Sequence, residues 1–220
     1  MKINDWESVA IIIGMIIGAG ILGMPYVFEK AGFLTGMVVI LIVAVVITML
    51  YLYTGEFVLR TKKRHQLTGY AEKYLGKTGK TFMFFSLLIG AYGAMIAYLL
   101  GISESLLTVF GGSRIIYTVA AFVVFSLIIF FGLYAVAKSE FYSSFIFLGL
   151  IFVVMIFCIP FIDFSNLATL DLSKFLIPYG PVLFAFLGFA AIPEAAEHLE
   201  EKRNLKKSII IGLSICTVVY

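Results

Sequence analysis

Long apolar runs separated by short polar segments make up most of this 220-residue chain. A helix needs about 20 apolar residues to cross a bilayer. The pattern predicts six membrane-spanning helices, at Asp5–Phe28, Phe33–Leu59, Thr81–Ser103, Ile115–Ala137, Phe141–Phe161 and Phe175–Leu199. A seventh apolar run opens near Ser208 and stops at Tyr220, too short to cross alone. We therefore expect either a fragment or a chain with an unusual C-terminus.

The composition and the distribution of charge indicate an integral membrane protein. Hydrophobic residues make up 62% and charged residues 13% of the chain, and the mean hydropathy of +1.08 lies far above that of soluble domains. A cytoplasmic N-terminus would place thirteen of the 16 Lys and Arg residues on the inner side, as basic residues usually are. We expect the cell membrane as location, with the basic residues meeting lipid headgroups and not nucleic acid.

Two glycine-to-proline breaks interrupt the first and the sixth predicted helices. Gly20 precedes Pro25, and Gly188 precedes Pro193, with the same Gly-x4-Pro spacing. Unwound backbone at membrane depth is tolerated only where protein or ligand surrounds it, and matching breaks in two segments are typical of transporters built from two repeats. The pattern predicts two discontinuous helices, each restarting at its proline. Close packing of neighbouring helices is the alternative explanation of the glycines.

The stretch Gly14–Gly32 resembles the first-helix signature of the amino acid/auxin permease family, within the amino acid, polyamine and organocation superfamily. The stretch Phe184–Glu194 is similar to the sixth-helix pattern of the same family. The resemblance implies an all-α, LeuT-like transporter fold with two inverted five-helix repeats. It implies a single transmembrane domain over 1–220, with the first repeat at 1–163 and the beginning of the second at 175–220.

Backbone groups freed at the two breaks would suit a zwitterion. A helix that stops exposes a negative carbonyl end, and the half that follows exposes a positive amide end. A free amino acid would place its carboxylate at the amides of Gly20–Gly23 and its ammonium group near the carbonyls of Ile17–Ala19 and Ala185–Gly188. Glycine leaves room for the ligand, so we expect Gly20→Leu to abolish binding without preventing membrane insertion.

The candidate substrate-binding residues are Ile17, Gly18, Ala19, Gly20, Ile21, Leu22 and Gly23 in the first segment and Ala185, Phe186, Gly188 and Phe189 in the sixth. The family resemblance adds Tyr92, on the third helix, as part of the wall of the side-chain pocket.

Two charged residues are candidates for coupling or gating. Glu194 follows Pro193 in the first turn of a half-helix, where it would gate the inner vestibule or simply be stabilised by the helix dipole. Lys138 opens the fifth segment, and in some superfamily members a lysine there resembles a substitute for sodium. Snorkelling of Lys138 to the headgroups is the alternative. We expect Glu56 to pair with the basic residues that begin at Arg60.

The sequence thus predicts a secondary active permease that moves a neutral or aromatic amino acid by alternating access, in symport with protons or sodium. A channel-like or non-transporting scaffold subunit is the alternative, because helix breaks also line pores. An enzyme is not expected, since no span carries paired His, Asp or Glu residues at catalytic or metal-binding spacing. The expected partners are an amino acid and the bilayer, with no cofactor beyond a coupling ion. The 220 residues are not expected to transport alone.

Overall fold

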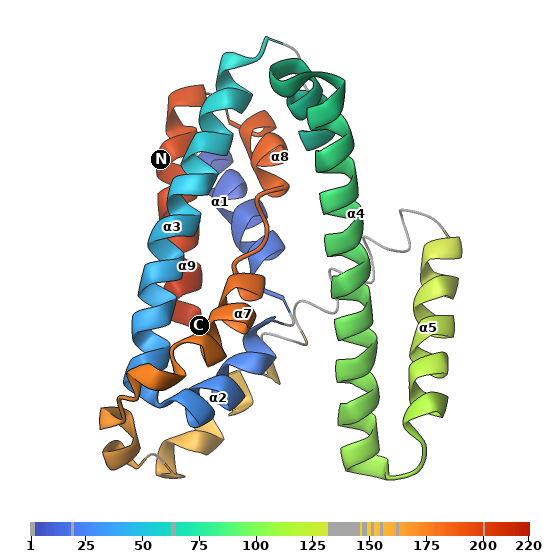
Figure 1. Cartoon of the computed structure of the whole chain (residues 1–220), viewed down its shortest axis with the longest axis vertical. Coiled ribbons are helices and arrows are strands. Elements are labelled where there is room, and N and C mark those ends of the chain that lie inside the picture. The colour runs from blue at the N-terminus through green and yellow to red at the C-terminus, as the bar shows by residue number, and fades with distance from the viewer. Residues whose placement is uncertain are drawn as a thin grey trace. The chain divides into compact units, whose positions relative to one another are not determined.

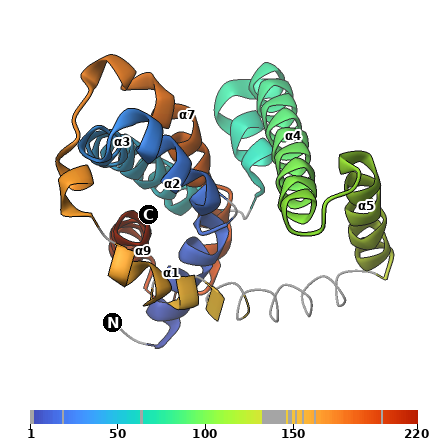
Figure 2. The same cartoon turned by 90° about the horizontal axis from the view of Figure 1, so that it is seen from below.

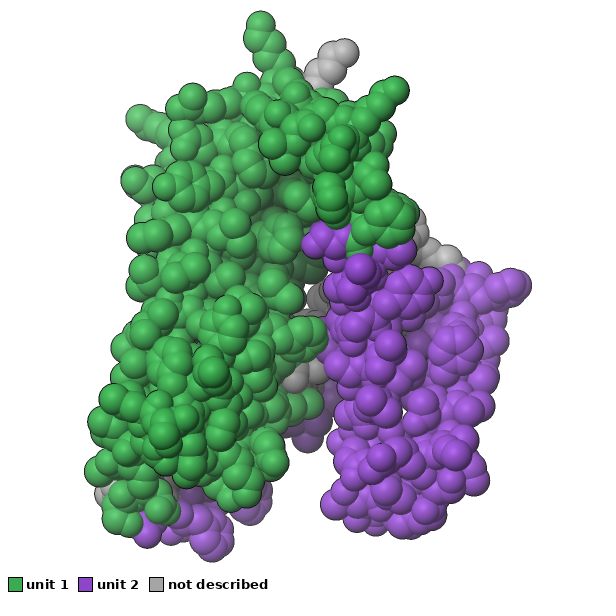
Figure 3. All heavy atoms as spheres, viewed as in Figure 1, with its two compact units in different colours: residues 1–85, 164–220 green, residues 86–163 purple. Residues whose placement is uncertain are grey.

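The structure is a computed structural model that describes residues 3–18, 20–62, 65–131, 146, 149–150, 152–154, 156–161, 163–199 and 201–220. Every regular element in these ranges is a helix (Figure 1). The chain separates into two compact units (Figure 3), the first formed by Met1–Phe85 and Phe164–Tyr220 and the second by Ser86–Asp163. These boundaries differ from those of the predicted repeats, which stay a prediction.

The first unit holds both predicted breaks. It contains α1 (Ile3–Ile16), α2 (Gly20–Ala31), α3 (Phe33–Arg60), the start of α4 (Leu67–Phe110), α7 (Leu176–Ala185), α8 (Ala191–Glu197) and α9 (Leu205–Val219). Short 3-10 turns, η2 (Phe164–Ala168), η3 (Leu172–Lys174) and η4 (Lys202–Asn204), lie between these helices. α3 runs without interruption for 28 residues because it contains no proline and its buried positions recur at helical spacing along one face.

Two helices of the first unit are interrupted. α1 and α2 meet at a bend of 58°, and residues 186–190 between α7 and α8 are not helical. α1 packs against α8 and α2 packs against α7, as can be followed in Figure 1. The two interrupted helices therefore run in opposite directions and bring their breaks together.

The core of the first unit surrounds the breaks. α9 packs against both α1 and α3, and Figure 2 shows it lying between them. Five side chains from these helices, from α8 and from the α7–α8 break are less than 2% exposed: Ile12, Tyr51, Phe186, Ile192 and Ile209. The two breaks therefore lie inside the packed core of the first unit.

Among the described residues, α3 and α4 are the two helices long and apolar enough to cross a membrane unaided, and the bent α1–α2 pair makes a third if it counts as one span. α4 turns at Gly76, whose φ of 71° favours glycine. The second unit holds the rest of α4, α5 (Arg114–Phe130) and η1 (Ile159–Phe161). The described residues form an all-helical protein consistent with a membrane protein, while the predicted count of six spans stays a prediction, since much of 141–161 lies outside them.

Candidate binding site at the two helix breaks

Two tyrosine side chains connect the ends of the interrupted helices. The hydroxyl of Tyr220, which follows α9, lies 2.7 Å from the carbonyl oxygen of Ile16 and 2.9 Å from that of Ala185. Ile16 is the last residue of α1, and Ala185 is the last residue of α7. Tyr51 on α3 donates a hydrogen bond of 3.0 Å to the next carbonyl, that of Phe186.

These hydrogen bonds follow from where each helix stops. The last carbonyls of a helix have no amide partner within it, and the membrane interior offers no water to replace one. A buried tyrosine hydroxyl has the matching need for a partner. The ring of Tyr220 also packs edge-on against the ring of Phe186, with centroids 5.2 Å apart. Aromatic side chains thus hold the carbonyl ends of α1 and α7 in one place.

Glycine permits the close approach of the two breaks. A Cβ atom added at Gly20 would lie 2.7 Å from the Cα of Ala185, and one added at Gly188 would lie 2.8 Å from Cγ1 of Ile16. Neither distance is possible for a real side chain without movement of the neighbour. Gly20 therefore acts as a packing position between α2 and α7, which is the alternative explanation of the glycines.

The helix ends give the junction two electrostatic poles. The carbonyl ends of α1 and α7 carry partial negative charge, whereas the first turn of α2 carries partial positive charge. The start of α8 contributes less, because Ala191 and Ile192 already donate their amides to Gly188 and Phe189, at 2.9 and 3.2 Å. In the first turn of α2 the Ile21 amide donates to the Gly18 carbonyl at 3.3 Å. The arrangement suits a molecule with an ammonium group for the carbonyls and a carboxylate for the other amides of this turn.

The structure places most of the predicted residues in or beside this junction. Ile17 and Gly18 are half-buried in the first break, Ile21 and Gly23 are half-buried in the first turn of α2, and Leu22 in the same turn is 67% exposed. In the second break Phe186 is fully buried, and Phe189 is half-buried. Ala19 lies outside the described residues. Tyr92 belongs to α4 in the second unit, so its role at the site stays a prediction.

The two prolines occupy different places in their helices. Pro193 is the third residue of α8, where its missing N–H has no partner to lose. Pro25 is the sixth residue of α2, because the helix restarts at Gly20 and not at the proline as expected. A proline there removes the usual amide donor to the Ile21 carbonyl.

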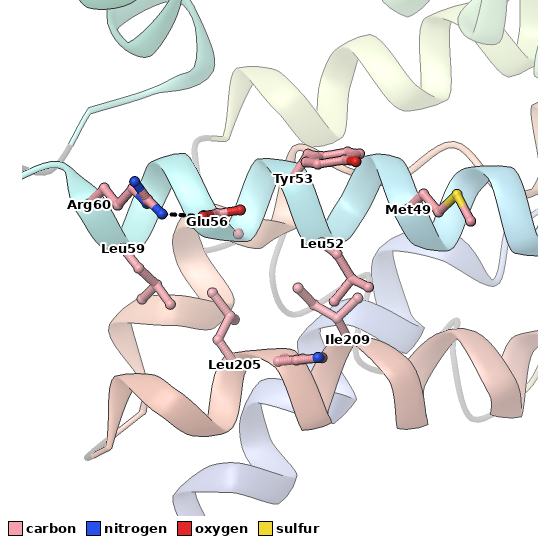
Figure 4. A pocket seen from close by; sticks show the side chains of 10 residues that line it. Met49, Leu52, Tyr53, Glu56, Leu59, Arg60, Leu205 and Ile209 are labelled. Carbon is pink, nitrogen blue, oxygen red and sulfur yellow. Dashed lines mark hydrogen bonds and ion pairs between the residues drawn. The ribbon is translucent and has the colours of Figure 1, made fainter.

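Two charged residues, Glu194 and Lys138, are the remaining candidates. Glu194 is in the first turn of α8 with an exposed side chain, and its role stays a prediction. Lys138 lies outside the described residues. The pairing of Glu56 with Arg60 is confirmed. This pair lines a groove of about 580 Å³ between α3 and α9 (Figure 4) that shares no lining residue with the breaks.

Sequence reasoning missed Tyr51 and Tyr220. Both stand in apolar runs, and a tyrosine inside a membrane span needs a hydrogen-bond partner for its hydroxyl. This need for a partner was the signal in the sequence that could have identified the two tyrosines. It does not say which carbonyl each hydroxyl meets, because the partners lie 35, 135 and 204 residues away along the chain.

Interrupted helices that meet inside an apolar, all-helical unit are typical of membrane transport proteins. Residues 1–220 match the tryptophan/tyrosine permease family, and the chain belongs to that family. The resemblance to the amino acid/auxin permeases therefore gave the right class, an amino acid permease, but the wrong family. The family is one of permeases and not of enzymes, in agreement with the prediction from the sequence.

Three curated relatives show how much of a permease the chain covers. It is 30% identical to tyrosine-specific transport system 1 of Haemophilus influenzae, over 97% of this chain and 54% of that protein. It is 25% identical to tyrosine-specific transport system 2 of the same bacterium and to glutamine transporter 2 of Aliivibrio fischeri, over 100% of this chain and 57% and 59% of those proteins. The chain thus spans little more than half of each relative. No solved structure matches it.

Proposed function

We propose that this chain forms the substrate-binding half of a secondary active transporter for amino acids, with an aromatic amino acid as substrate. One observation carries the proposal. The carbonyl ends of α1 and α7 meet within hydrogen-bonding distance of a single hydroxyl, next to the amide end of α2, in a chain of the tryptophan/tyrosine permease family. The names of two of the relatives, which are tyrosine-specific transport systems, support an aromatic substrate.

The bound amino acid would lie across the junction. Its ammonium group would bond to the carbonyls of Ile16 and Ala185, and its carboxylate would accept from amides in the Gly20–Gly23 turn. The ring of Phe186 would pack beside an aromatic side chain. Both charges of the substrate would thus be neutralised by backbone dipoles, without a charged side chain in the membrane interior.

The antiparallel course of the interrupted helices supports a LeuT-like fold with inverted repeats. Repeats of opposite topology place corresponding helices side by side in opposite directions, as α1–α2 and α7–α8 are. Each break would then act as a hinge. Movement of α1 against α8 would open one side of the membrane, and movement of α2 against α7 would open the other. The protein would lie in the cell membrane with its N-terminus in the cytoplasm, driven by a proton or sodium gradient.

Binding of tritiated tyrosine to the purified chain in detergent tests this function. Saturable binding that unlabelled tyrosine and tryptophan displace is expected, with weaker displacement by glutamine. The analogue 3-(4-hydroxyphenyl)propionate, which lacks the ammonium group, should compete poorly because the carbonyl ends have nothing to bind. Equal displacement by all amino acids, or no saturable binding by the folded chain, would overturn the proposal.

A further inference from the structure

One hydroxyl serves two carbonyls at the junction. Tyr220 lies within hydrogen-bonding distance of both Ile16 and Ala185, at 2.7 and 2.9 Å, yet a phenol has one proton to donate. It can satisfy one of the two oxygens fully, or both in part. The pair of carbonyls therefore has the capacity for a ligand with more protons to donate.

We propose that the Tyr220 hydroxyl holds the ammonium position of the empty site, and that an incoming amino acid takes the carbonyls of Ile16 and Ala185 from it. The inference rests on the proposed function and adds to it a residue that sets selectivity for the amino group. A primary ammonium has three protons, and a charged donor bonds about twice as strongly as a neutral one. The negative ends of α1 and α7 add to its advantage over the neutral phenol.

The surroundings of Tyr220 allow this exchange, whereas those of Tyr51 do not. Tyr51 is fully buried in α3 and bonds to one carbonyl, so its hydroxyl is a fixed part of the core. Tyr220 is half-buried, and its ring packs edge-on against Phe186. Because the hydroxyl oxygen lies on the axis of the ring, it leaves the carbonyls only when the whole ring swings away from Phe186, which a half-buried side chain is freer to do than a fully buried one. A compound without an amino group does not repay the loss of the Tyr220 hydrogen bonds, so the site rejects it.

Tyr220→Phe tests the exchange, with Tyr53→Phe as the matched control. Tyr53 is 69% exposed on α3 and lines the groove between α3 and α9, which shares no lining residue with the breaks. Because the substrate no longer competes with a hydroxyl, Tyr220→Phe should bind tritiated tyrosine roughly 2- to 10-fold more tightly, the range that one net hydrogen bond allows. Tyr53→Phe should bind as the original chain does. Weaker binding by Tyr220→Phe would mean that the hydroxyl only supports the site, and would overturn the inference.

A second measurement follows the hydroxyl itself and does not need a variant that lacks it. 3-Fluorotyrosine is introduced at position 220, or at position 53 as a control, and the fluorine resonance is recorded during titration with tyrosine. The resonance at 220 should shift with saturation, and 3-(4-hydroxyphenyl)propionate should leave it in place. Tyrosine that binds without moving this resonance would overturn the inference alone. Absence of tyrosine binding to the folded chain would overturn the proposed function, and the inference with it.

Discussion

Gly20 decides how closely two helices of the first unit approach. The atom that an added methyl group would meet is the Cα of Ala185, which belongs to the backbone of α7 and cannot rotate away. At Gly14, on α1, an added methyl group would meet nothing within 4 Å. Comparing an alanine substitution at Gly20 with one at Gly14 therefore separates the effect of packing from the effect of helix propensity.

Gly20→Ala should destabilise the folded chain by about 1–3 kcal/mol, because α2 and α7 must move apart. Gly14→Ala should be neutral or should stabilise by up to about 1 kcal/mol, since alanine favours a helix. The measurement is the midpoint of SDS unfolding of each variant in detergent, followed by circular dichroism. Equal midpoints for the two variants would contradict the packing role of Gly20. The larger change Gly20→Leu would disturb this contact as well as any bound substrate.

Asp171 provides a pH-dependent contact outside the predicted spans. Hydrogen bonds from the Ser173 hydroxyl and from Lys174 hold the pKa of this carboxyl below its ordinary value of 3.8. A lowered pKa in the folded state means that the ionised form stabilises the fold. This stabilisation is complete above the ordinary pKa and is lost as the pH falls below 4 and through the folded value.

Amide hydrogen exchange at Ser173 measures this dependence, because its N–H donates to the Asp171 carboxylate at 3.1 Å. After correction for the intrinsic rate, protection of the Ser173 amide should fall between pH 5 and pH 2. Asp171→Asn keeps an oxygen acceptor but has no charge to lose, so its protection should not change with pH. A decline of the same size in both proteins would assign the effect to another group.

The start of α3 depends on a segment far away in the sequence. Phe33 donates its amide to Oγ1 of Thr169, and Leu34 donates its amide to the Thr169 carbonyl, both at 3.0 Å. Gly32 just before the helix has a φ of 91°, and a Cβ there would lie 2.8 Å from the Thr169 carbonyl oxygen. Glycine at 32 thus allows one threonine to satisfy two helix-start amides that have no partner within α3.

Thr169→Val should remove one of these two hydrogen bonds and leave the other. Loss of a helix cap costs about 1 kcal/mol, so exchange of the Phe33 amide should become faster while that of Leu34 changes little. Thr108→Val is the control, because the Thr108 hydroxyl bonds only to the Glu104 carbonyl one turn earlier in α4. Equal acceleration at both amides would indicate general loosening and not the loss of a cap.

At the scale of elements, the sequence predicted the interruptions better than their limits. The glycines predicted two places where helical hydrogen bonding is interrupted. The structure has non-helical residues at both, between α1 and α2 and between α7 and α8. Pro25 suggested that the second half of the helix would begin at the proline, but α2 begins at Gly20. Proline is well tolerated at the start of a helix, but a helix does not have to start there. The limit is set by the contact between Gly20 and Ala185, which no local pattern reveals.

At the scale of the whole molecule, hydropathy was enough to predict an all-helical membrane protein. The amino acid permease was predicted from the resemblance of the two broken segments, and the family match supports that class. Unpaired carbonyls follow from any helix end, so the sequence predicted the Ala185 carbonyl at the site. In the first segment the carbonyl at the junction is that of Ile16, one residue before the predicted Ile17–Ala19. The side chains that bond to these carbonyls could not be predicted from the sequence. Tyr51 and Tyr220 reach the breaks from helices that pack there only in the folded unit, so their roles depend on tertiary structure.

The central claim, that an amino acid binds between the two breaks, is tested most directly by substrate protection of one introduced thiol. Ile17→Cys places it in the first break, and Met15→Cys, at a position 51% exposed on α1, is the control. Both changes are made with the exposed Cys158 replaced by serine, while Cys216 is buried. Saturating tyrosine should slow alkylation of Ile17→Cys and leave Met15→Cys unaffected. Equal alkylation of Ile17→Cys with and without bound tyrosine would contradict the account.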